Sequence, residues 1–374
     1  MSETEMTDDS AAPATPDPSA TGAPLRGDTM IVASSGRYLP KSGHDHEEGS
    51  ETSGRPDHLG QRTFIDGSGE RPARDEFARS DEQAHPKSLS LSCVILTMGD
   101  RPAEVNRAIA SVLAQRGPAV ELVVVGNGTE VTGLPAGVKT VSLPENVGVA
   151  AGRNAGVEAC RGDVVLFLDD DGWYPDTGLA AHIAAAFAAD PALAVLSMQV
   201  VDPDGGPGAR WHVPRLRAGD PDRSSVVTTF LGGASAIRRS AFTEAGGYPD
   251  EFFYGHEETD LAWRLLDRGY RLEYDATARM YHHTLPNARY DTFRHRDGRN
   301  RVLLARRNLP WPLAAIYLAD WMALTIAREH ARPRSLRPWF TGFAEGWRTD
   351  PGRRRPISLG TAWRMTQAGR PPII

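Results

Sequence analysis

The chain has 374 residues, with 42 basic and 48 acidic side chains and a formal net charge of −6 at pH 7. This balance lacks the basic excess of non-specific nucleic-acid binding, so we predict no nucleic-acid partner. The only cysteines, Cys93 and Cys160, stand among apolar residues, which argues against a disulfide framework. The acidic, proline-containing start differs from a secretory signal, so we expect a cytoplasmic location.

Residues 1–85 are rich in Ser, Thr, Pro, Gly, Asp, Glu and His, with few adjacent large apolar residues. Such a segment cannot bury enough surface to offset its ordering entropy, and we predict a disordered tail. A short strand within residues 30–39 is the one element that we consider there. The run HDHEE at 44–48 contains metal-ligand types, but without a surrounding core we interpret it as a solvated polar run.

Residues 86–290 alternate between short apolar runs and helical periodicity. Strands are predicted at 89–97, 120–128, 138–144 and 164–169, and helices follow the first and third of them. The first helix shows its apolar side at Val105, Ile109 and Val112, and the second is the Ala-rich segment 149–159. Strands that alternate with helices indicate an α/β domain whose mostly parallel sheet is flanked by helices.

Polar residues follow three of these strands: Thr97, the turn 126–128, and the aspartates 169–171. The carboxyl ends of parallel strands form the ligand crevice of such a sheet, so these residues are expected to converge. Asp169 and Asp171 alternate with Asp170 and project to one side of the extended chain. Their mutual repulsion is relieved by a divalent cation, which also binds a diphosphate. Three aspartates also suit a helix-capping turn, and on this run alone both interpretations remain open.

The motifs from about Leu89 to His283 resemble family 2 glycosyltransferases, in the family's order. The resemblance lies in CVILTMGDRPAEVNRAIASVLAQ, in ENVGVAAGRNAGVEACRGDVVLFLDDD, and in the long block from FLGGASAIRR to MYHH. It implies a GT-A fold, a nucleoside-diphosphate sugar donor, Mg²⁺ or Mn²⁺ as cofactor, and inversion at the anomeric carbon. The likeness is to cell-envelope enzymes of the actinobacterial type.

The resemblance also implies roles for individual residues. Its donor-binding candidates are Thr97 and Asn127 near the base and ribose, Arg153 and Asn154 near the phosphates or holding the neighbouring loop, Asp169 and Asp170 near the ribose and sugar, and Gly233 where a sugar approaches the backbone. Asp171 and His282 would hold the metal, with His283 as the competing histidine. The family's aspartate after the second strand is replaced by Gly126, so thymidine, uridine and guanosine donors all remain open.

An inverting transfer needs a general base beside the acceptor hydroxyl, and Glu258 occupies the position of the family's catalytic aspartate. The helix that carries it is predicted to begin near His256, and Glu258 shares a face with Leu261 and Leu265. Glu257 and Asp260 are secondary candidates, because they line up with Arg264 where an ion pair is the simpler interpretation. The nearby aromatic residues of 248–254 suit either an acceptor wall or the core.

Residues 291–374 are predicted to form a basic, aromatic, helical extension. Seven arginines between 289 and 307 precede an apolar stretch at 309–327, whose two prolines and Asp320 argue against a membrane span. An interfacial amphipathic helix and a buried helix are both compatible with it. The arginines and tryptophans suggest peripheral contact with the inner face of the cell membrane and a glycan or lipid-linked acceptor.

Two other functions compete with glycosyl transfer. A noncatalytic nucleotide-sugar-binding or scaffolding protein would explain the departures at Gly126 and Glu258. A nucleotidyltransferase would need a phosphate loop rich in glycine and lysine after its first strand, and TMGDRP does not provide one.

Overall fold

The computed structural model describes residues 29–31, 89–205, 212–217, 219–283, 290–330 and 333–374. The polar run at 44–48 and most of the predicted N-terminal tail lie outside these residues. The short strand that we considered within residues 30–39 corresponds in part to β1 (Thr29–Ile31), which pairs in parallel with β4 (Lys139–Leu143).

The described residues contain a nine-stranded sheet with the order β1-β4-β3-β2-β5-β8-β6-β9-β7. The strands not yet delimited are β2 (Leu91–Thr97), β3 (Val120–Asn127), β5 (Val164–Asp169), β6 (Leu193–Val201), β7 (Ser225–Val226), β8 (Ala234–Arg238) and β9 (Arg271–Tyr281). The β1–β5 half of the sheet is parallel, whereas β8 is antiparallel to both β5 and β6. The predicted mostly parallel sheet is confirmed, and the antiparallel strands among the described residues are β8 and the short β7, which pairs with β9.

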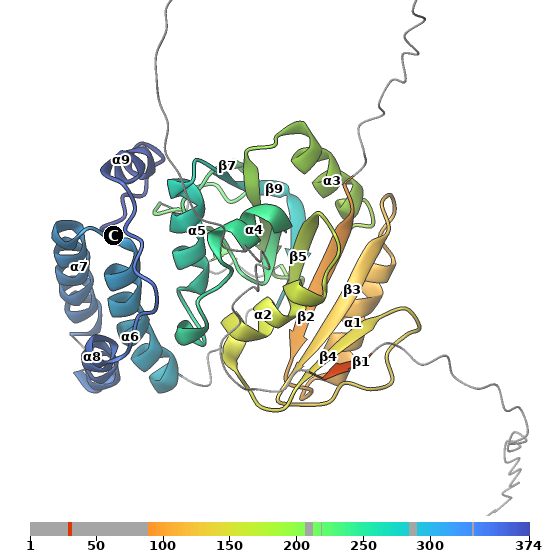
Figure 1. The fold of residues 1–374 in the computed structure, drawn as a ribbon, viewed down its shortest axis with the longest axis horizontal. Helices are drawn as coiled ribbons and strands as arrows, with labels where there is room; N and C mark the ends of the chain where they lie inside the picture. Colours follow the sequence, from red (N-terminus) through yellow and green to blue (C-terminus); the bar gives the residue numbers. More distant parts are fainter. Residues whose placement is uncertain (1–28, 32–88, 206–211, 218, 284–289, 331–332) are drawn as a thin grey trace, which may run out of the picture. The chain divides into compact units, whose positions relative to one another are not determined.

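Helices cover both faces of the sheet (Figure 1). One apolar core contains α1 (Pro102–Leu113) and α3 (Leu179–Ala189). The other core contains α2 (Gly148–Ala159), α4 (Arg239–Ala245) and α5 (Glu257–Asp267). The buried positions of α1 are Val105, Ala108, Ile109 and Val112, which is the spacing that places residues on one helical face.

The C-terminal residues form four helices: α6 (Tyr290–Asn308), α7 (Trp311–Glu329), α8 (Pro333–Arg348) and α9 (Leu359–Gln367). They pack into the same core cluster as α2 and α5, so the extension and the sheet form one compact unit. Close approach of α6 and α8 depends on glycine: a Cβ at Gly342 would lie 1.9 Å from the carbonyl oxygen of His295. Among the helices of the described segments, none has both the length and the apolar character needed to cross a membrane.

Candidate active site

The sheet brings the polar strand ends together as the sequence predicts. In the register of β2 with its neighbours, Thr97 pairs with Gly126 and Leu96 pairs with Asp169. Asp170 follows and is buried, and burial raises its pKa to about 6 although the Thr97 hydroxyl and Arg101 both lower it. A carboxyl group with this pKa carries only part of its charge in mildly acidic solution. Asp169 and Asp171 are the more exposed members of the run.

His282 lies beside Asp171, with 3.1 Å between Nε2 of the ring and Oδ1 of the carboxylate. An isolated β-bridge explains this contact, because Trp173 and Tyr281 exchange backbone hydrogen bonds of 3.0 and 2.8 Å. Asp171 lies two residues before Trp173, and His282 lies one residue after Tyr281. The bridge therefore holds these two side chains close together. The hydrogen bond with Asp171 raises the pKa of His282 despite its burial. Nδ1 of His282 is buried and has no hydrogen-bond partner among the described residues.

Arg101, which the sequence analysis did not single out, also contacts this acidic strand end. Its guanidinium bonds to the carboxylate of Asp171 and lies 3.6 Å from that of Asp170. Burial raises the pKa of Asp171, but the hydrogen bond from His282 and the charges of His282 and Arg101 outweigh it, and the pKa is lowered. Nothing in the turn GDRP distinguishes this arginine from an ordinary surface residue. Only the spatial proximity of β2 and β5 reveals it.

A buried arginine links the acids of β5 and α5. Arg153 of α2 lies 3.0 Å from Asp169, 3.4 Å from Glu258 and 3.9 Å from Glu257. Burial alone lowers the pKa of Arg153, but the charge of Asp169 and those of the two glutamates outweigh it, and its pKa stands above the ordinary value. The predicted donor residues Arg153 and Asp169 and the predicted base Glu258 therefore share one charged cluster.

Two glycines make room for this cluster. A Cβ on Gly233 would lie 2.0 Å from the carboxylate of Asp169, and one on Gly232 would lie 2.1 Å from Oε1 of Glu258. A side chain at either position would displace these charged groups, so the arrangement of the cluster depends on both glycines. At Gly233 the space of a Cβ is taken by the carboxylate of Asp169. The predicted approach of a sugar to the backbone at Gly233 stays a prediction.

The helical pattern places Glu258 on the buried face of α5, but in the structure Glu257 is the more buried of the two adjacent glutamates. The helix begins at Glu257, one residue after the predicted start, and Leu261 and Leu265 are fully buried. Glu257 is 1% exposed, whereas the side chain of Glu258 retains 21% of its exposure. Burial, and then the charge of Glu258, raises the pKa of Glu257 to about 8. Burial therefore favours the protonated form of Glu257, and Glu258 is the acid that faces the accessible side.

Replacing Glu257 with Gln is expected to remove a pH dependence of stability. The folded-state pKa lies above the ordinary value of 4.5, so the folded protein binds more protons than the unfolded chain between these values. Stability is thus lost as pH rises through this window, with a slope of up to about 1.4 kcal/mol per pH unit. Urea denaturation at pH 5.5 and pH 8 should show Glu257→Gln gaining stability relative to wild type at the higher pH. The exposed Glu244→Gln is the control, and parallel profiles for wild type and Glu257→Gln would contradict the assignment.

The turn after β3 is shaped by its own packing. A Cβ at Gly126 would lie 2.2 Å from the carbonyl oxygen of Thr129, so the aspartate typical of the family does not fit here. The amide of Asn127 donates to Asn146 at 3.0 Å and to the carbonyl of Gly148 at 3.3 Å, and it accepts the N–H of Val147 at 2.9 Å. Asn127 therefore organises the loop before α2, and its predicted nucleotide contact stays a prediction.

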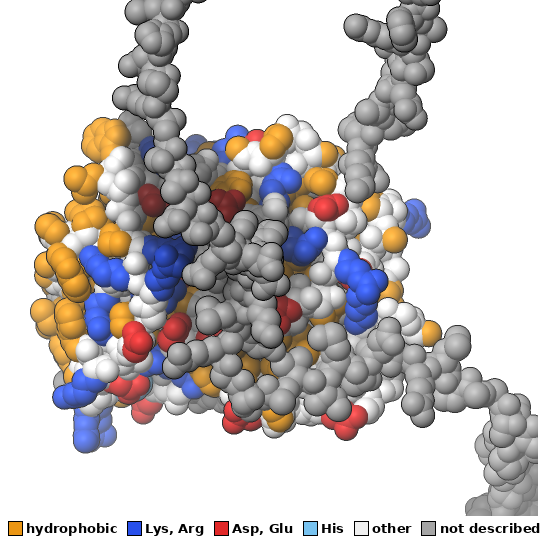
Figure 2. Space-filling view, in the orientation of Figure 1, with side chains coloured by type: hydrophobic (Ala, Val, Ile, Leu, Met, Phe, Trp, Pro, Cys, Tyr) orange, Lys and Arg blue, Asp and Glu red, His pale blue; other side chains and the backbone are white. Residues whose placement is uncertain are grey.

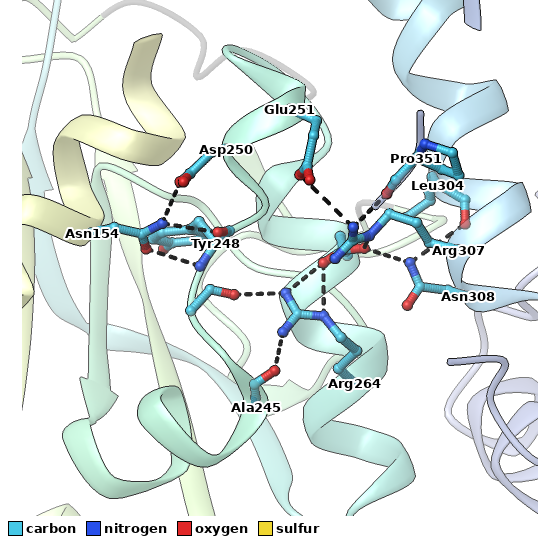
Figure 3. Close-up of polar contacts among 12 residues, drawn as sticks. Asn154, Ala245, Tyr248, Asp250, Glu251, Arg264, Leu304, Arg307, Asn308 and Pro351 are labelled. Atoms are coloured by element: carbon cyan, nitrogen blue, oxygen red, sulfur yellow. Dashed lines mark hydrogen bonds and ion pairs between the residues drawn. The ribbon is translucent and has the colours of Figure 1, made fainter. Parts of the chain in front are cut away.

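Asn154 holds a neighbouring loop, which is one of its two predicted roles. Its amide nitrogen donates to the carbonyl of Tyr248 at 2.9 Å and to Asp250 at 2.8 Å, and its oxygen accepts the N–H of Tyr248 at 3.0 Å (Figure 3). Of the aromatic residues in 248–254, Tyr248 and Phe252 are core residues, whereas Tyr254 is 45% exposed. The possible acceptor wall is thus reduced to the end of this segment.

Asp260 joins α5 to the C-terminal helices. Its carboxylate is fully buried and bonds to Arg264, to Arg307 at 2.9 Å, and to the amide of Asn308. Figure 3 shows Arg264 on α5 and Arg307 on α6 facing each other across this junction. The ion pair with Arg264 that the sequence suggests is present. Asp260 faces the helix junction and is not part of the Arg153 cluster.

His283 points to a different group from His282. Its Nδ1 lies 3.2 Å from Asp204, and its ring packs against Trp173 with 5.5 Å between ring centroids. Asp202, Asp204 and His283 bring three possible ligand atoms within 4.8 Å of one another. This second group is largely exposed, and it does not include Asp171.

Comparison with known proteins identifies the class to which this site belongs. Residues 92–246 match the model of glycosyl transferase family 2, and residues 216–291 match the N-terminal domain of galactosyltransferase. The match to glycosyl transferase family 2 covers less than half of the chain and agrees with the resemblance that the motifs show.

Among individual relatives, the pre-mycofactocin glycosyltransferase of Mycobacterium tuberculosis is 28% identical over 204 residues, which cover 50% of this chain and 42% of that protein. The succinoglycan biosynthesis protein ExoO of Rhizobium meliloti is 38% identical over 108 residues, or 27% of this chain and 31% of that protein. The chain spans less than half the length of either relative.

A solved structure of GalNAc-T7 with UDP, GalNAc and Mn²⁺ aligns with a TM-score of 0.51 at 17% identity, over 76% of this chain and 55% of that one. This likeness concerns the fold, and it confirms the predicted GT-A-like class.

Proposed function

We propose that the protein is a metal-dependent, inverting glycosyltransferase that moves a sugar from a nucleoside-diphosphate sugar to a hydroxyl group of a glycan, a lipid-linked or a small-molecule acceptor. The observation that carries the proposal is the meeting of two acidic motifs and a distant histidine at one edge of the sheet. Asp171 contacts His282, while Asp169 and Glu258 share Arg153. Residues far apart in sequence gather here, as a shared catalytic cleft requires.

The residues present fit a divalent cation. Asp171 supplies carboxylate oxygens and His282 supplies ring nitrogens, a donor set suited to Mn²⁺ and, through the carboxylate, to Mg²⁺. The buried and unpartnered Nδ1 of His282 indicates a polar group that the protein alone does not satisfy. When bound, the cation would neutralise the charge of the departing diphosphate. Arg101, now on Asp171, is positioned to turn to the phosphates as a second positive charge.

The chain's own residues supply the remaining roles. Asp169, held at 3.0 Å by Arg153, faces the ribose and donor sugar. Glu258 takes the proton from the acceptor hydroxyl on the side opposite the leaving diphosphate. Arg153 keeps these two carboxylates at fixed positions, so the donor and the base are oriented by one buried cation.

Titration calorimetry with UDP, GDP and dTDP, each with and without Mn²⁺, tests the donor site. The proposal requires one of these nucleotides to bind more tightly with the metal. If the protein binds a nucleotide but releases none from any nucleotide sugar, with or without acceptors, the result would instead favour a scaffolding protein. GalNAc-T7, with UDP and Mn²⁺ in its structure, guides the first choice of nucleotide and metal.

We also propose that α7 touches a membrane surface. Its outward stripe is apolar throughout and includes Ile316, Met322 and Ile326, which are 44%, 38% and 45% exposed. The other members of the exposed stripe are Pro312, Ala315, Ala319, Ala323 and Ala327. Figure 2 shows hydrophobic side chains gathered along the edge where Figure 1 places α7. An apolar face of this kind marks an interaction site.

Basic and aromatic residues border this stripe. Trp311 and Trp363 are 57% and 63% exposed, Arg354 stacks over Trp311 at 4.2 Å, and Arg353 and Arg355 are exposed beside it. Tryptophan beside arginine suits the headgroup region of an anionic bilayer. Several arginines of α6 that were expected to meet lipid are instead used internally: Arg294 binds Glu329, Arg299 binds Glu345, Arg301 binds Asp297, and Arg307 binds Asp260.

The double variant Met322→Ser, Ile326→Ser is expected to reduce binding to phosphatidylglycerol vesicles about tenfold or more, because each buried apolar side chain contributes roughly 1.5–3 kcal/mol. Flotation with these vesicles and with phosphatidylcholine alone measures the effect. The control is Leu113→Ser, which removes an equally exposed apolar side chain on α1. Flotation of the double variant that equals that of wild type would contradict membrane contact. A wild-type dimer that dissociates in the double variant would also contradict it, because the stripe would then be a contact between two copies of the chain.

A further inference from the structure

A cavity of about 240 Å³ lies between the segment that precedes α5 and the C-terminal helix α6. Its lining is Tyr254, Gly255 and His256 on one side and Phe293, Asp297 and Arg301 on the other. Phe293 and Asp297 have no role predicted from the sequence, and Arg301 is one of the basic residues of the predicted extension. The pocket exists only because α6 packs against α5.

The backbone beneath this cavity is held in an uncommon conformation. Phe253 and His256 have positive φ angles of 61° and 72°, which non-glycine residues rarely adopt. The buried amide of Asn300 donates to three carbonyl oxygens of this segment, at 2.9 Å to Phe252, 3.0 Å to Tyr254 and 2.7 Å to Gly255. Strained segments that the surroundings hold this firmly cluster at ligand sites.

The cavity lies close to the proposed base along the chain. Glu258 stands two residues after His256, which lines the cavity, and four after Tyr254, which also lines it. Burial raises the pKa of the Tyr254 hydroxyl to about 12, and the charges of Asp169 and Glu258 act on it in the same direction. Neither Asp169 nor Glu258 lines the cavity itself.

The lining combines aromatic faces with a charge-balanced polar group. Tyr254 and Phe293 are 45% and 38% exposed, so their rings are available to a ligand. The Asp297 carboxylate is paired with Arg301 at 3.0 Å and with His256 at 2.9 Å. Because Arg301 is already neutralised, the pocket offers no free cation from these lining residues to an anionic ligand. Oδ2 of Asp297 accepts the N–H of Trp339 at 2.8 Å and keeps one further acceptor position for a hydroxyl group of a ligand.

We infer that this cavity is the acceptor subsite and that it takes a neutral sugar, which packs its apolar face on Tyr254 and Phe293 and directs its hydroxyls to Asp297 and His256. The inference rests on the proposed function and names the acceptor class for the same site. Helix α6, outside the segment that matches family 2, then determines which acceptor the enzyme accepts. An aromatic ring beside a few fixed polar groups is the usual make-up of such a pocket.

Saturation-transfer NMR on the full chain tests the inference with three neutral probes, the methyl glycosides of glucose, mannose and galactose, and with glucose 6-phosphate as an anionic comparison. At least one neutral glycoside is expected to bind wild type. Phe293→Ala should raise its dissociation constant about fivefold or more, and Phe293→Leu, which keeps apolar volume without the ring, should also weaken it. Leu113→Ala, an exposed apolar truncation on the other face of the sheet, should leave it unchanged.

Equal binding by wild type and both Phe293 variants would overturn the inference, and so would a preference for glucose 6-phosphate or the failure of every neutral glycoside. Calorimetry with the nucleoside diphosphates on the same samples separates the two proposals. If nucleotide binding still depends on the metal but sugar binding is the same in wild type and the Phe293 variants, only the acceptor subsite is rejected. If the wild-type protein binds none of the nucleoside diphosphates, the proposed function itself is rejected.

Discussion

Asp171→Ala is expected to abolish metal-supported binding of the nucleoside diphosphate, with at least a hundredfold rise in Kd in the presence of Mn²⁺. The carboxylate is one of two side chains that the structure offers to the cation, and it lies 3.1 Å from the other, His282. Removing it leaves an imidazole whose single neutral nitrogen holds a hard cation weakly. A hundredfold rise in Kd corresponds to a loss of about 2.7 kcal/mol of binding free energy, which is modest for the removal of a side chain that holds the metal.

Calorimetry with and without Mn²⁺ measures the change, and the control is Asp176→Ala. Asp176 stands in the same loop five residues later but is exposed, and its carboxylate bonds to the N–H of Gly178. The variant should keep the metal effect. If Asp171→Ala retains the affinity of wild type with metal present, the cation is held elsewhere, and the group of Asp202, Asp204 and His283 becomes the site to examine.

The strand ends could be predicted from sequence because they follow from local pattern. Apolar runs that end in Thr97, Asn127 and Asp169 identify parallel strands, and parallel strands place their carboxyl ends together. The register confirms this, with Leu96 beside Asp169. His282 came from the order of the family's motifs. Its contact with Asp171 depends on the bridge between Trp173 and Tyr281, which no local pattern signals.

The contacts between the sheet and the C-terminal helices could not be predicted in the same way. The arginines of α6 look in sequence like a basic surface, yet Arg301 and Arg307 are largely buried and paired with Asp297 and Asp260. Whether an arginine meets solvent or a buried carboxylate depends on helix packing, and here that packing depends on glycines such as Gly342. Sequence periodicity placed Glu258 on the buried face of the helix, whereas the structure buries Glu257 and leaves Glu258 partly exposed.

Arg101 and Gly232 show a third limit. The guanidinium of Arg101 acts on Asp170 and Asp171 only because two strands are neighbours. Gly232 matters because a Cβ there would displace the carboxylate of Glu258 from its present position. Each depends on a partner more than twenty residues away, so neither has a signal within its own segment.

Glu258→Gln is expected to reduce transfer at least a thousandfold while the Kd for the nucleoside diphosphate changes less than twofold. The amide keeps the shape of the side chain and can still bond to Arg153, which lies 3.4 Å from Oε1 in the native protein. It cannot accept the proton of the acceptor hydroxyl, and general-base catalysis contributes about a hundredfold to ten-thousandfold to a rate. Initial rates of nucleotide release with acceptor present, set beside calorimetry, give the two quantities.

Glu258→Asp is the matched variant, because it restores the residue typical of the family and keeps the proton-accepting group. Its carboxylate is shorter by one methylene and moves away from Gly232, whose missing side chain fits the longer glutamate. We expect it to retain between about a tenth and a hundredth of the native rate, since a misplacement of this size costs up to about a hundredfold. A Gln variant as active as the Asp variant would exclude Glu258 as the base. Glu257, with a pKa of about 8, would then be the remaining carboxyl group on α5 beside Arg153, and activity should rise with pH through that value.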